Sequence, residues 1–410
     1  MALVKNIHDD KQVKISTWLG LAIVPLSGFA TDIFIPSMPA ISADLHVSNL
    51  QVQLTLSFFL ISFGSTQLIV GAILDSFGRY KAGLTALLFF VLASVVIANT
   101  SNIFLIYGMR MVHGITAATI VVAKRAFFVD TYQGEKLKNY LSVFTIIWSV
   151  GPIVAPFVGG YLQNSFGWHS NFYFLAVLAG FIGIMEMLFS KESLLAPVPF
   201  NLKRIFATYL EMLSTANFIL GLVMLGLGYS MVMIYNLTGP FILGHDLHKS
   251  PVIIGYCSLF LGFAWTAGGL IGKATIDKPF FSKLMINLII QLVFGIGMVL
   301  IAGHFNSLFT ILFFAFIIHT CGGYTFNNYF TFNMSLFPKN AGIAGGMIGG
   351  IVYIIISGLT YGIIKVLPAK DEYNLSYSYI FLIAASALVM FFLYRLNRIK
   401  KPGSTILSVH

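Results

Sequence analysis

Apolar segments long enough to cross a lipid bilayer recur along the whole of this 410-residue chain. A membrane-spanning helix needs about 20 predominantly apolar residues, because each residue adds about 1.5 Å along the helix axis. Hydrophobic residues make up 58% of the sequence and charged residues only 9%. That proportion is too apolar for the surface of a soluble protein of this length. The chain is therefore predicted to be an all-α polytopic membrane protein.

Hydropathy divides the chain into about twelve spans joined mostly by short links. The longest link, residues 191–213, separates six spans from six, which predicts a duplicated transporter with a binding site near the bilayer midplane between the halves. We expect six-helix bundles at residues 15–190 and 214–396, and tails at 1–14 and 397–410. The spans are expected at residues 15–38, 49–72, 80–99, 102–128, 137–163, 170–190, 214–238, 250–275, 281–303, 307–335, 340–366 and 375–396.

The positions of Lys and Arg predict the orientation of the chain. Most of the 24 lie in the two tails and in the links after even-numbered spans, whereas the opposite links hold only Lys249, Lys365 and Lys370. Because cytoplasmic loops carry the excess of Lys and Arg, both termini are predicted to be cytoplasmic. The net charge of +10 predicts no nucleic-acid partner, since the basic residues form no stripe with interleaved aromatics. Cys257 and Cys321 fall inside apolar segments and are expected to be packing residues.

Span four combines spanning length with four basic side chains: Arg110, His113, Lys124 and Arg125. A charge within a membrane helix is costly, so it usually faces a bundle interior or a water-filled cavity. Lys124 and Arg125 lie towards the cytoplasm and project about 100° apart. One is expected to snorkel to the headgroups. If the other faces the cavity, the excess of positive charge there would suit an anionic substrate.

Asp32 in span one is the candidate partner of Arg110. With the termini inside, Asp32 lies ~9 Å and Arg110 ~12 Å from the outer ends of their helices. Similar depth would let the two charges pair, either as a fixed structural ion pair or as a carboxylate that exchanges a proton under the influence of Arg110. A neighbouring cation favours the ionised carboxylate, whereas burial favours the neutral form. His113 lies on the same helical face as Arg110, as a coupling group or as a packing residue.

Two further motifs stand out. The link after span two contains Asp75, Gly78 and Arg79, which predicts a tight turn with a charge cluster. Span five is rich in residues that bend a helix or allow close packing, either as a rocking element or as a well-packed helix. These residues are Gly151, Pro152, Pro156, Gly159 and Gly160.

Together these features resemble a known family. The chain is similar to the twelve-span transporters of the major facilitator superfamily, in the drug:proton antiporter group and its bicyclomycin/chloramphenicol-resistance (Bcr/CflA) subfamily. The family's loop motif is matched by Asp75, Gly78 and Arg79, its span-four motif by Arg110 and Gly114, and its span-five motif by Gly151, Pro152, Gly159 and Gly160. The subfamily is indicated by TDIFIPSMP, VQLTLSFFL, FGWHSNF, TGPFIL and FPKNAGIAGG. His113, Tyr80 and Val129 depart from the usual motif residues, which leaves the substrate open.

The resemblance implies two pseudo-symmetric six-helix bundles whose spans one, four, seven and ten line a central cavity. Proton coupling is then expected at Asp32, Arg110 and His113. Each amide in a span could instead bond a neighbouring helix, but their concentration in span ten favours a ligand-facing surface. The expected substrate-binding residues are Asp32, Arg110, Lys124, Tyr235, Asn236, Tyr324, Asn327 and Asn328, with Tyr229 also expected in the cavity.

The favoured function is multidrug-type, proton-coupled efflux of small organic molecules by alternating access. The alternative is a proton-coupled carrier of one anionic metabolite or siderophore, in either direction, and a membrane-embedded enzyme or receptor is a third possibility. The sequence shows no nucleotide-binding loop, no metal-ligand spacing and no nucleophile–base set. We therefore expect neither enzymatic activity nor a metal or cofactor. The family implies a monomer in the bacterial inner membrane.

Overall fold

The computed structural model describes residues 10–194, 196–197, 199, 202–302, 304 and 307–399. Within these ranges the chain is helical, without strands, and has twelve helices long and apolar enough to cross a membrane. The predicted all-α fold with twelve spans is confirmed. The outer parts of both predicted tails, residues 1–9 and 400–410, and residues 195, 198, 200 and 201 of the predicted link lie outside the described residues. The chain forms two compact units, Met1–Leu202 and Lys203–His410, here called unit 1 and unit 2.

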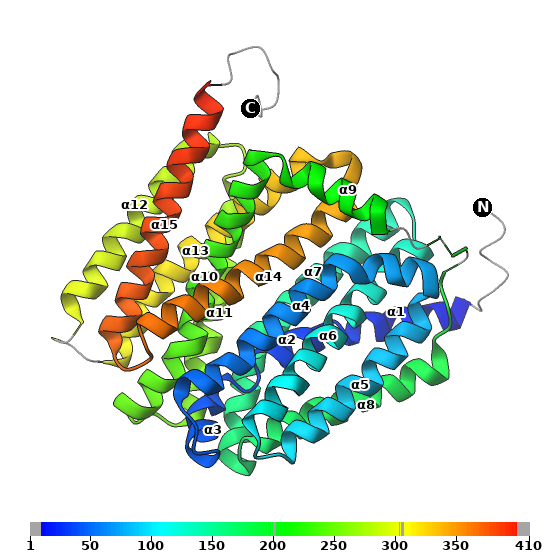
Figure 1. Cartoon of the computed structure of the whole chain (residues 1–410), viewed down its shortest axis with the longest axis horizontal. Coiled ribbons are helices and arrows are strands. Elements are labelled where there is room, and N and C mark those ends of the chain that lie inside the picture. Colours follow the sequence, from blue (N-terminus) through cyan, green and yellow to red (C-terminus); the bar gives the residue numbers. More distant parts are fainter. Residues whose placement is uncertain are drawn as a thin grey trace. The chain divides into compact units, whose positions relative to one another are not determined.

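Unit 1 contains the first six spans, drawn from blue to green in Figure 1. Its first span is divided, because prolines start new helical segments where their missing N–H donors cost nothing. Pro25, Pro36 and Pro39 each lie in the first turn of such a segment. The elements of unit 1 are α1 (Asp10–Ala22), α2 (Pro25–Asp32), η1 (Ile35–Ser37), α3 (Met38–Asp44), α4 (Asn49–Phe77), α5 (Arg79–Ala98), α6 (Ile103–Thr131), α7 (Gly134–Phe166) and α8 (His169–Phe189).

Unit 2 contains the other six spans. It begins with α9 (Leu202–Leu213), a helix within the predicted link that hydropathy did not reveal because it is too short to span. The elements that follow are α10 (Ala216–Phe241), a π-helical turn η2 (Ile242–Asp246), α11 (Pro251–Ala274), α12 (Phe280–Ile301), α13 (Leu308–Leu336), η3 (Pro338–Asn340), α14 (Ala341–Val366) and α15 (Glu372–Ile399).

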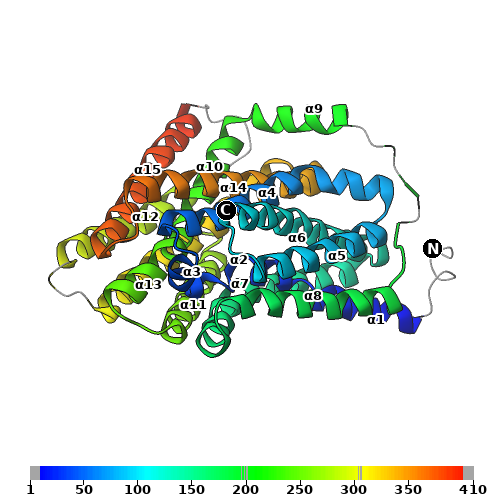
Figure 2. The same ribbon diagram turned by 60° about the horizontal axis from the view of Figure 1, so that its bottom comes forward.

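The same pairs of spans pack together in both units. In unit 1, α6 packs against α4 and α5, α5 packs against α8, and α2 packs against α7 (Figure 2). In unit 2 the corresponding spans are α13 with α11 and α12, α12 with α15, and α10 with α14. This repeated pairing is the pseudo-symmetry that equal groups of six spans predicted.

Side-chain caps determine where several of these helices begin. Ser48 and Gln51 form a reciprocal capping box at the start of α4. The side chain of Asn102 accepts from the first free N–H groups of α6, and Ser250 and Ser307 cap α11 and α13. Each cap satisfies backbone donors that lack a partner within the helix.

The end of the divided first span is held by residues near the start of α8. The indole Nε1 of Trp168 donates to Asp44 at 2.9 Å, and Nδ2 of Asn171 donates to the hydroxyl of Ser37 at 2.7 Å. Both donors belong to the FGWHSNF segment. This segment therefore fixes the path of the chain just beyond Asp32.

Glycines bring α2 and α7 into backbone contact. A Cβ added to Gly28 would collide with Pro152, and one added to Gly159 would collide with the carbonyl group of Ile33. The helix α7 continues through Pro152 and Pro156. The small residues of the predicted span-five motif thus form the surface on which α2 and the residue after Asp32 rest.

We predict that Gly159→Ala lowers the free energy of unfolding by about 1–3 kcal/mol, because the methyl group has no space against the backbone of Ile33. Gly108→Ala in α6 is the matched control, since nothing lies within 4 Å of the Cβ added there. Alanine also favours a helix over glycine by about 1 kcal/mol, so the control should be neutral or stabilised. Thermal unfolding in detergent compares the two, and equal stabilities would refute the close packing.

Candidate functional site

Arg110 is completely buried in unit 1. Its Nη1 donates to the carbonyl oxygen of Ala30 at 2.7 Å, and its guanidinium carbon lies 4.6 Å from the ring centroids of both Phe34 and Phe59. Asp32, 1% exposed at the end of α2, is close enough to Arg110 for their charges to interact. The structure thus brings together Asp32 and Arg110, which were expected to pair because the sequence placed them at similar depth in the membrane. Aromatic faces and a backbone carbonyl supply the rest of the compensation that a buried cation requires.

His113 is also completely buried, and it faces α5. Its Nε2 lies 2.9 Å from the hydroxyl oxygen of Ser94, and its ring stacks on Phe90 with centroids 4.4 Å apart. The Ser94 hydroxyl donates its hydrogen to the carbonyl of Phe90, so Nε2 of His113 must be the donor to Ser94. The remaining Nδ1, 3.4 Å from Nη1 of Arg110, is then an acceptor. This geometry describes a neutral imidazole that orients Arg110.

Lys124 forms a buried ion pair that the sequence did not reveal. Its Nζ lies 2.6 Å from Oε2 of Glu186 on α8, and the two side chains are 13% and 2% exposed. The stem of Lys124 passes Gly20 of α1, while Arg125 is the more exposed member of the adjacent basic pair. Lys124 therefore neither snorkels nor contributes an unbalanced charge, because Glu186 neutralises it inside unit 1.

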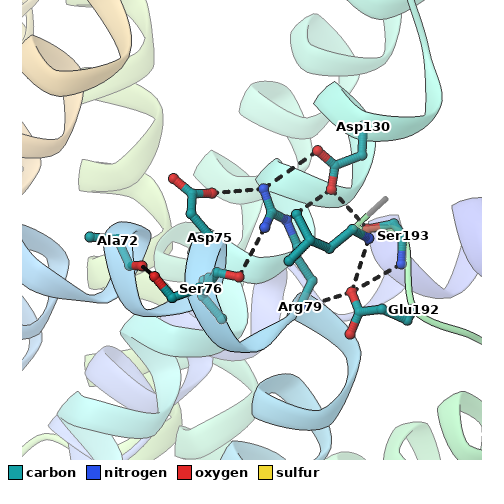
Figure 3. Close-up of polar contacts among 9 residues, drawn as sticks. Ala72, Asp75, Ser76, Arg79, Asp130, Glu192 and Ser193 are labelled. Carbon is teal, nitrogen blue, oxygen red and sulfur yellow. Dashed lines mark hydrogen bonds and ion pairs between the residues drawn. The ribbon is translucent and has the colours of Figure 1, made fainter. Parts of the chain in front are cut away.

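The loop motif forms a charge cluster around Arg79, shown in Figure 3. The guanidinium lies 2.7 Å from Asp75 and 2.8 Å from Asp130 at the end of α6, and Nη1 donates to the carbonyl of Leu74. Ser193, beyond α8, donates to Asp130 at 3.0 Å. Arg79 therefore joins the end of α4 to the end of α6 and the segment after α8.

Gly78 and Glu192 shape the turn that presents Arg79. Gly78 has φ of 99°, a conformation that favours glycine. The Glu192 carboxylate accepts from the backbone N–H groups of Arg79 and Tyr80 at 2.9 and 3.1 Å. It thus caps α5, and a Cβ on Gly78 would collide with it. An anion at a helix start is stabilised by the free N–H groups there.

Several candidate residues of unit 2 have partners within that unit. Tyr235 is 1% exposed with its ring edge-on to His319, whose Nε2 lies 3.1 Å from the hydroxyl of Tyr379. The hydroxyl of Tyr324 lies 2.9 Å from that of Thr275. Asn328 donates to the carbonyl of Tyr324 and is buried, whereas Asn236 and Asn327 are half-buried.

A cluster of half-buried aromatic side chains joins four helices of unit 2. Tyr229 of α10 contacts Trp265 of α11, Phe326 of α13 and Tyr353 of α14, with ring centroids 5.3, 6.0 and 6.1 Å apart, and Trp265 contacts Phe326 at 5.4 Å. All four rings retain some exposed surface. We call this group the aromatic cluster. Such ring faces suit a flat apolar or cationic molecule.

Residues 21–359 match the sequence model of the Major Facilitator Superfamily. The chain belongs to this superfamily. The predicted family is thereby confirmed, and the protein is a multi-pass membrane transporter of small molecules.

Known proteins resemble this transporter, two of them along most of its length. It is 26% identical to the uncharacterized MFS-type transporter YdgK of Bacillus subtilis over 85% of this chain and 87% of that protein. It is 25% identical to multidrug resistance protein D of Escherichia coli over 86% of this chain and 89% of the relative. A bicyclomycin resistance protein homolog of Haemophilus influenzae is 33% identical over 37% of this chain and 38% of that protein. These relatives agree with the predicted Bcr/CflA-like subfamily.

Solved structures share the fold. A D-xylose-proton symporter superposes with a TM-score of 0.69 at 14% identity, covering 93% of this chain and 97% of the symporter. The nucleoside transporter NupG superposes with a TM-score of 0.70 at 12% identity, covering 94% and 98% of the two chains.

Sequence reasoning found the basic side chains of this transporter more readily than the acids that compensate them. Asp130, Glu186 and Glu192 went unnamed because each is a single acid without a motif around it. The available signal was that acids are rare within apolar spans. An acid in such a span, such as Glu186, therefore needs a partner. Aromatic residues are too common in the spans to mark Trp265, Phe326 or Tyr353 individually.

We predict that Lys124→Met and Glu186→Leu each lower the free energy of unfolding by about 3–5 kcal/mol, because each leaves one buried charge without its partner. The double variant should lose less than either single variant. The exposed pair Lys138–Glu135, 2.9 Å apart with side chains 75% and 82% exposed, is the matched control and should couple by only ~0–1 kcal/mol. Double-mutant cycles by thermal unfolding in detergent measure both couplings, and additive effects at Lys124 and Glu186 would argue against the buried pair.

Proposed function

We propose that this transporter exports small organic molecules across the bacterial inner membrane in exchange for protons, as a monomer with both termini cytoplasmic. The observation that carries the proposal is the buried Asp32 beside the fully buried Arg110. An ionisable acid inside a membrane span is expensive to maintain and usually marks an ion or substrate path. The names of the relatives, multidrug resistance protein D and a bicyclomycin resistance protein homolog, support export of organic compounds.

Because of Arg110, the packing around Asp32 depends on whether Asp32 is ionised or protonated. When Asp32 is ionised, its attraction to Arg110 favours the present packing of the Ala30–Phe34 segment, in which Arg110 also contacts the carbonyl of Ala30 and the ring of Phe34. When Asp32 takes up a proton, that attraction is lost and burial favours the neutral acid. His113 holds the guanidinium in place between these states. Proton uptake at Asp32 is therefore coupled to the position of the segment that joins α2 to η1, and alternating access would use that coupling.

The substrate surface that we propose in unit 2 consists of the aromatic cluster with the half-buried amides Asn236 and Asn327. Tyr235, Tyr324 and Asn328 are buried and have contacts within unit 2, so we assign them a supporting role and not direct contact with substrate. An anionic substrate is less favoured than the sequence suggested, because Glu186 balances Lys124. Efflux of planar, largely apolar compounds is accordingly preferred to transport of an anionic metabolite or siderophore.

We predict that Asp32→Asn abolishes accumulation driven by a pH gradient, because the amide cannot exchange a proton, while downhill exchange persists. Proteoliposomes with an imposed pH gradient and a panel of fluorescent aromatic compounds, including ethidium, provide the measurement. Asp277→Asn, at an exposed acid beyond α11, is the control and should transport normally. Uphill transport by Asp32→Asn at the wild-type rate would refute the coupling role. Failure of the wild type to move any compound would count against drug export itself.

We predict that Trp265→Ala raises the Kd for transported aromatic compounds by about 2–10-fold, since an aromatic contact contributes about 0.5–1.5 kcal/mol beyond its buried area. Phe313→Ala, which removes a ring that is 57% exposed on α13, is the control. Fluorescence titration of the purified variants gives both affinities. Equal Kd values for Trp265→Ala and the control would exclude the aromatic cluster from the substrate surface.

A further inference from the structure

Glu372, the first residue of α15, is a buried acid. The residue is 3% exposed, and among the described residues neither of its carboxylate oxygens has a hydrogen-bond partner. A buried ionised carboxylate normally needs a cation or several donors to offset the loss of hydration. This residue was not singled out by its sequence context, since it follows Asp371 at the end of an ordinary polar link.

A second acid lies near Glu372. Asp246, on the π-helical turn η2, is close enough to repel it electrostatically. Asp246 comes near Glu372 because of the way α10 and α15 pack. Asn217 near the start of α10 forms a hydrogen bond with Asn397 near the end of α15. The two helices are therefore antiparallel, and η2 at the end of α10 lies towards the start of α15. Two acids in proximity cannot both ionise cheaply.

Capping does not explain Glu372. The Asp371 side chain accepts from the N–H group of Asn374 at 2.9 Å, and its carbonyl accepts from that of Leu375 at 3.5 Å. The start of α15 is thus capped by Asp371. The helix dipole still favours an anion at this position, but it acts without a direct donor to Glu372.

In the part of unit 2 that the structure describes, the elements around Glu372 offer it no partner cation. On η2 the other titratable group is His245, which is exposed. On α12 the one charged side chain is Lys283, at the far end, since Phe281 beside it contacts Tyr394 near the end of α15. The helix α10 carries no charged residue. Three lysines beyond these elements, Lys249 before α11, Lys365 in the last turn of α14 and Lys370 before α15, donate no hydrogen bond to Glu372.

From this arrangement we infer that Glu372 is a proton-binding site of unit 2, held as a neutral carboxylic acid while it is packed near η2. Release breaks the O–H bond of the acid and transfers the proton to water, which requires solvent to reach the carboxyl group. The turn η2 is suited to controlling that access, because π-helical turns are rare in proteins as a whole and, where they occur, are often at functional sites. The inference extends the proposed proton coupling from Asp32 to a second acid.

Infrared spectroscopy of the purified full-length protein tests the inference without any substrate, so its outcome is independent of drug export. At neutral pH the wild type should show the carbonyl stretch of a buried protonated carboxyl group. Glu372→Gln should lose that contribution while remaining folded, because the amide is neutral and similar in shape. Glu211→Gln, at an exposed acid on α9, should leave the spectrum unchanged. An identical protonated-carboxyl signal in wild type and Glu372→Gln would overturn the assignment.

A second variant tests the role of the neighbouring acid. Asp246→Asn removes the negative charge near Glu372, so the protonated-carboxyl signal should disappear at a lower pH in this variant than in the wild type. The same titration of Glu211→Gln should follow the wild type. If Asp246→Asn also titrates like the wild type, repulsion from η2 does not hold the proton on Glu372 and the proposal fails.

Discussion

The packing of unit 1 depends on one constraint, which is that each charge buried in an apolar environment needs compensation. The helix α6 carries the charges that satisfy this constraint. Three side chains on this helix bind three different neighbours: Arg110 binds the α2 segment, Lys124 binds Glu186 on α8, and Asp130 binds Arg79 at the start of α5. Each contact joins a charge on one element to its compensation on another. An uncompensated buried charge is costly. These three ion contacts therefore determine the neighbours of α6 at three positions along its length.

Unit 2 repeats the helix pairing of unit 1 with different interior chemistry. Its buried polar contacts are mainly between neutral groups, such as His319 with Tyr379 and Asn287 with Thr325. Neutral pairs cost less to bury than ions, and they leave ring faces such as those of the aromatic cluster for binding. Glu372 is the exception, and neutralisation by a proton would bring it into line with its surroundings. The duplicated fold thus supports two different kinds of chemistry.

The sequence predicted those features that are set within a single helix. Hydropathy located the twelve spans, and residue counting placed Asp32 and Arg110 at similar depth. It did not predict the partner of Lys124, because hydropathy specifies neither the rotation of a helix nor which neighbour it meets. The angular separation of Lys124 and Arg125 indicated that they face different surroundings, but only the three-dimensional structure shows that Lys124 meets Glu186 of α8. The breaks in span one follow from Pro25 and Pro36, whose effect on a helix is local, yet hydropathy averages over them.

The glycines of α7 bear on the proton coupling that we propose for the charges of α6. Ile33 follows Asp32 directly, and its carbonyl group rests on Gly159, while Ala30 and Phe34 on either side of Asp32 contact Arg110. The segment that carries the acid therefore lies between the buried Arg110 of α6 and the glycine-containing surface of α7. On α7 the indole Nε1 of Trp148 donates to the hydroxyl of Ser27 on α2, whereas at Ile33 the contact is made by Gly159, whose lack of a side chain lets the two backbones meet. The movement that we propose for the Asp32 segment therefore depends both on the charge at α6 and on this close contact with α7. This gives the span-five glycines and the span-four arginine a shared physical role around one carboxyl group.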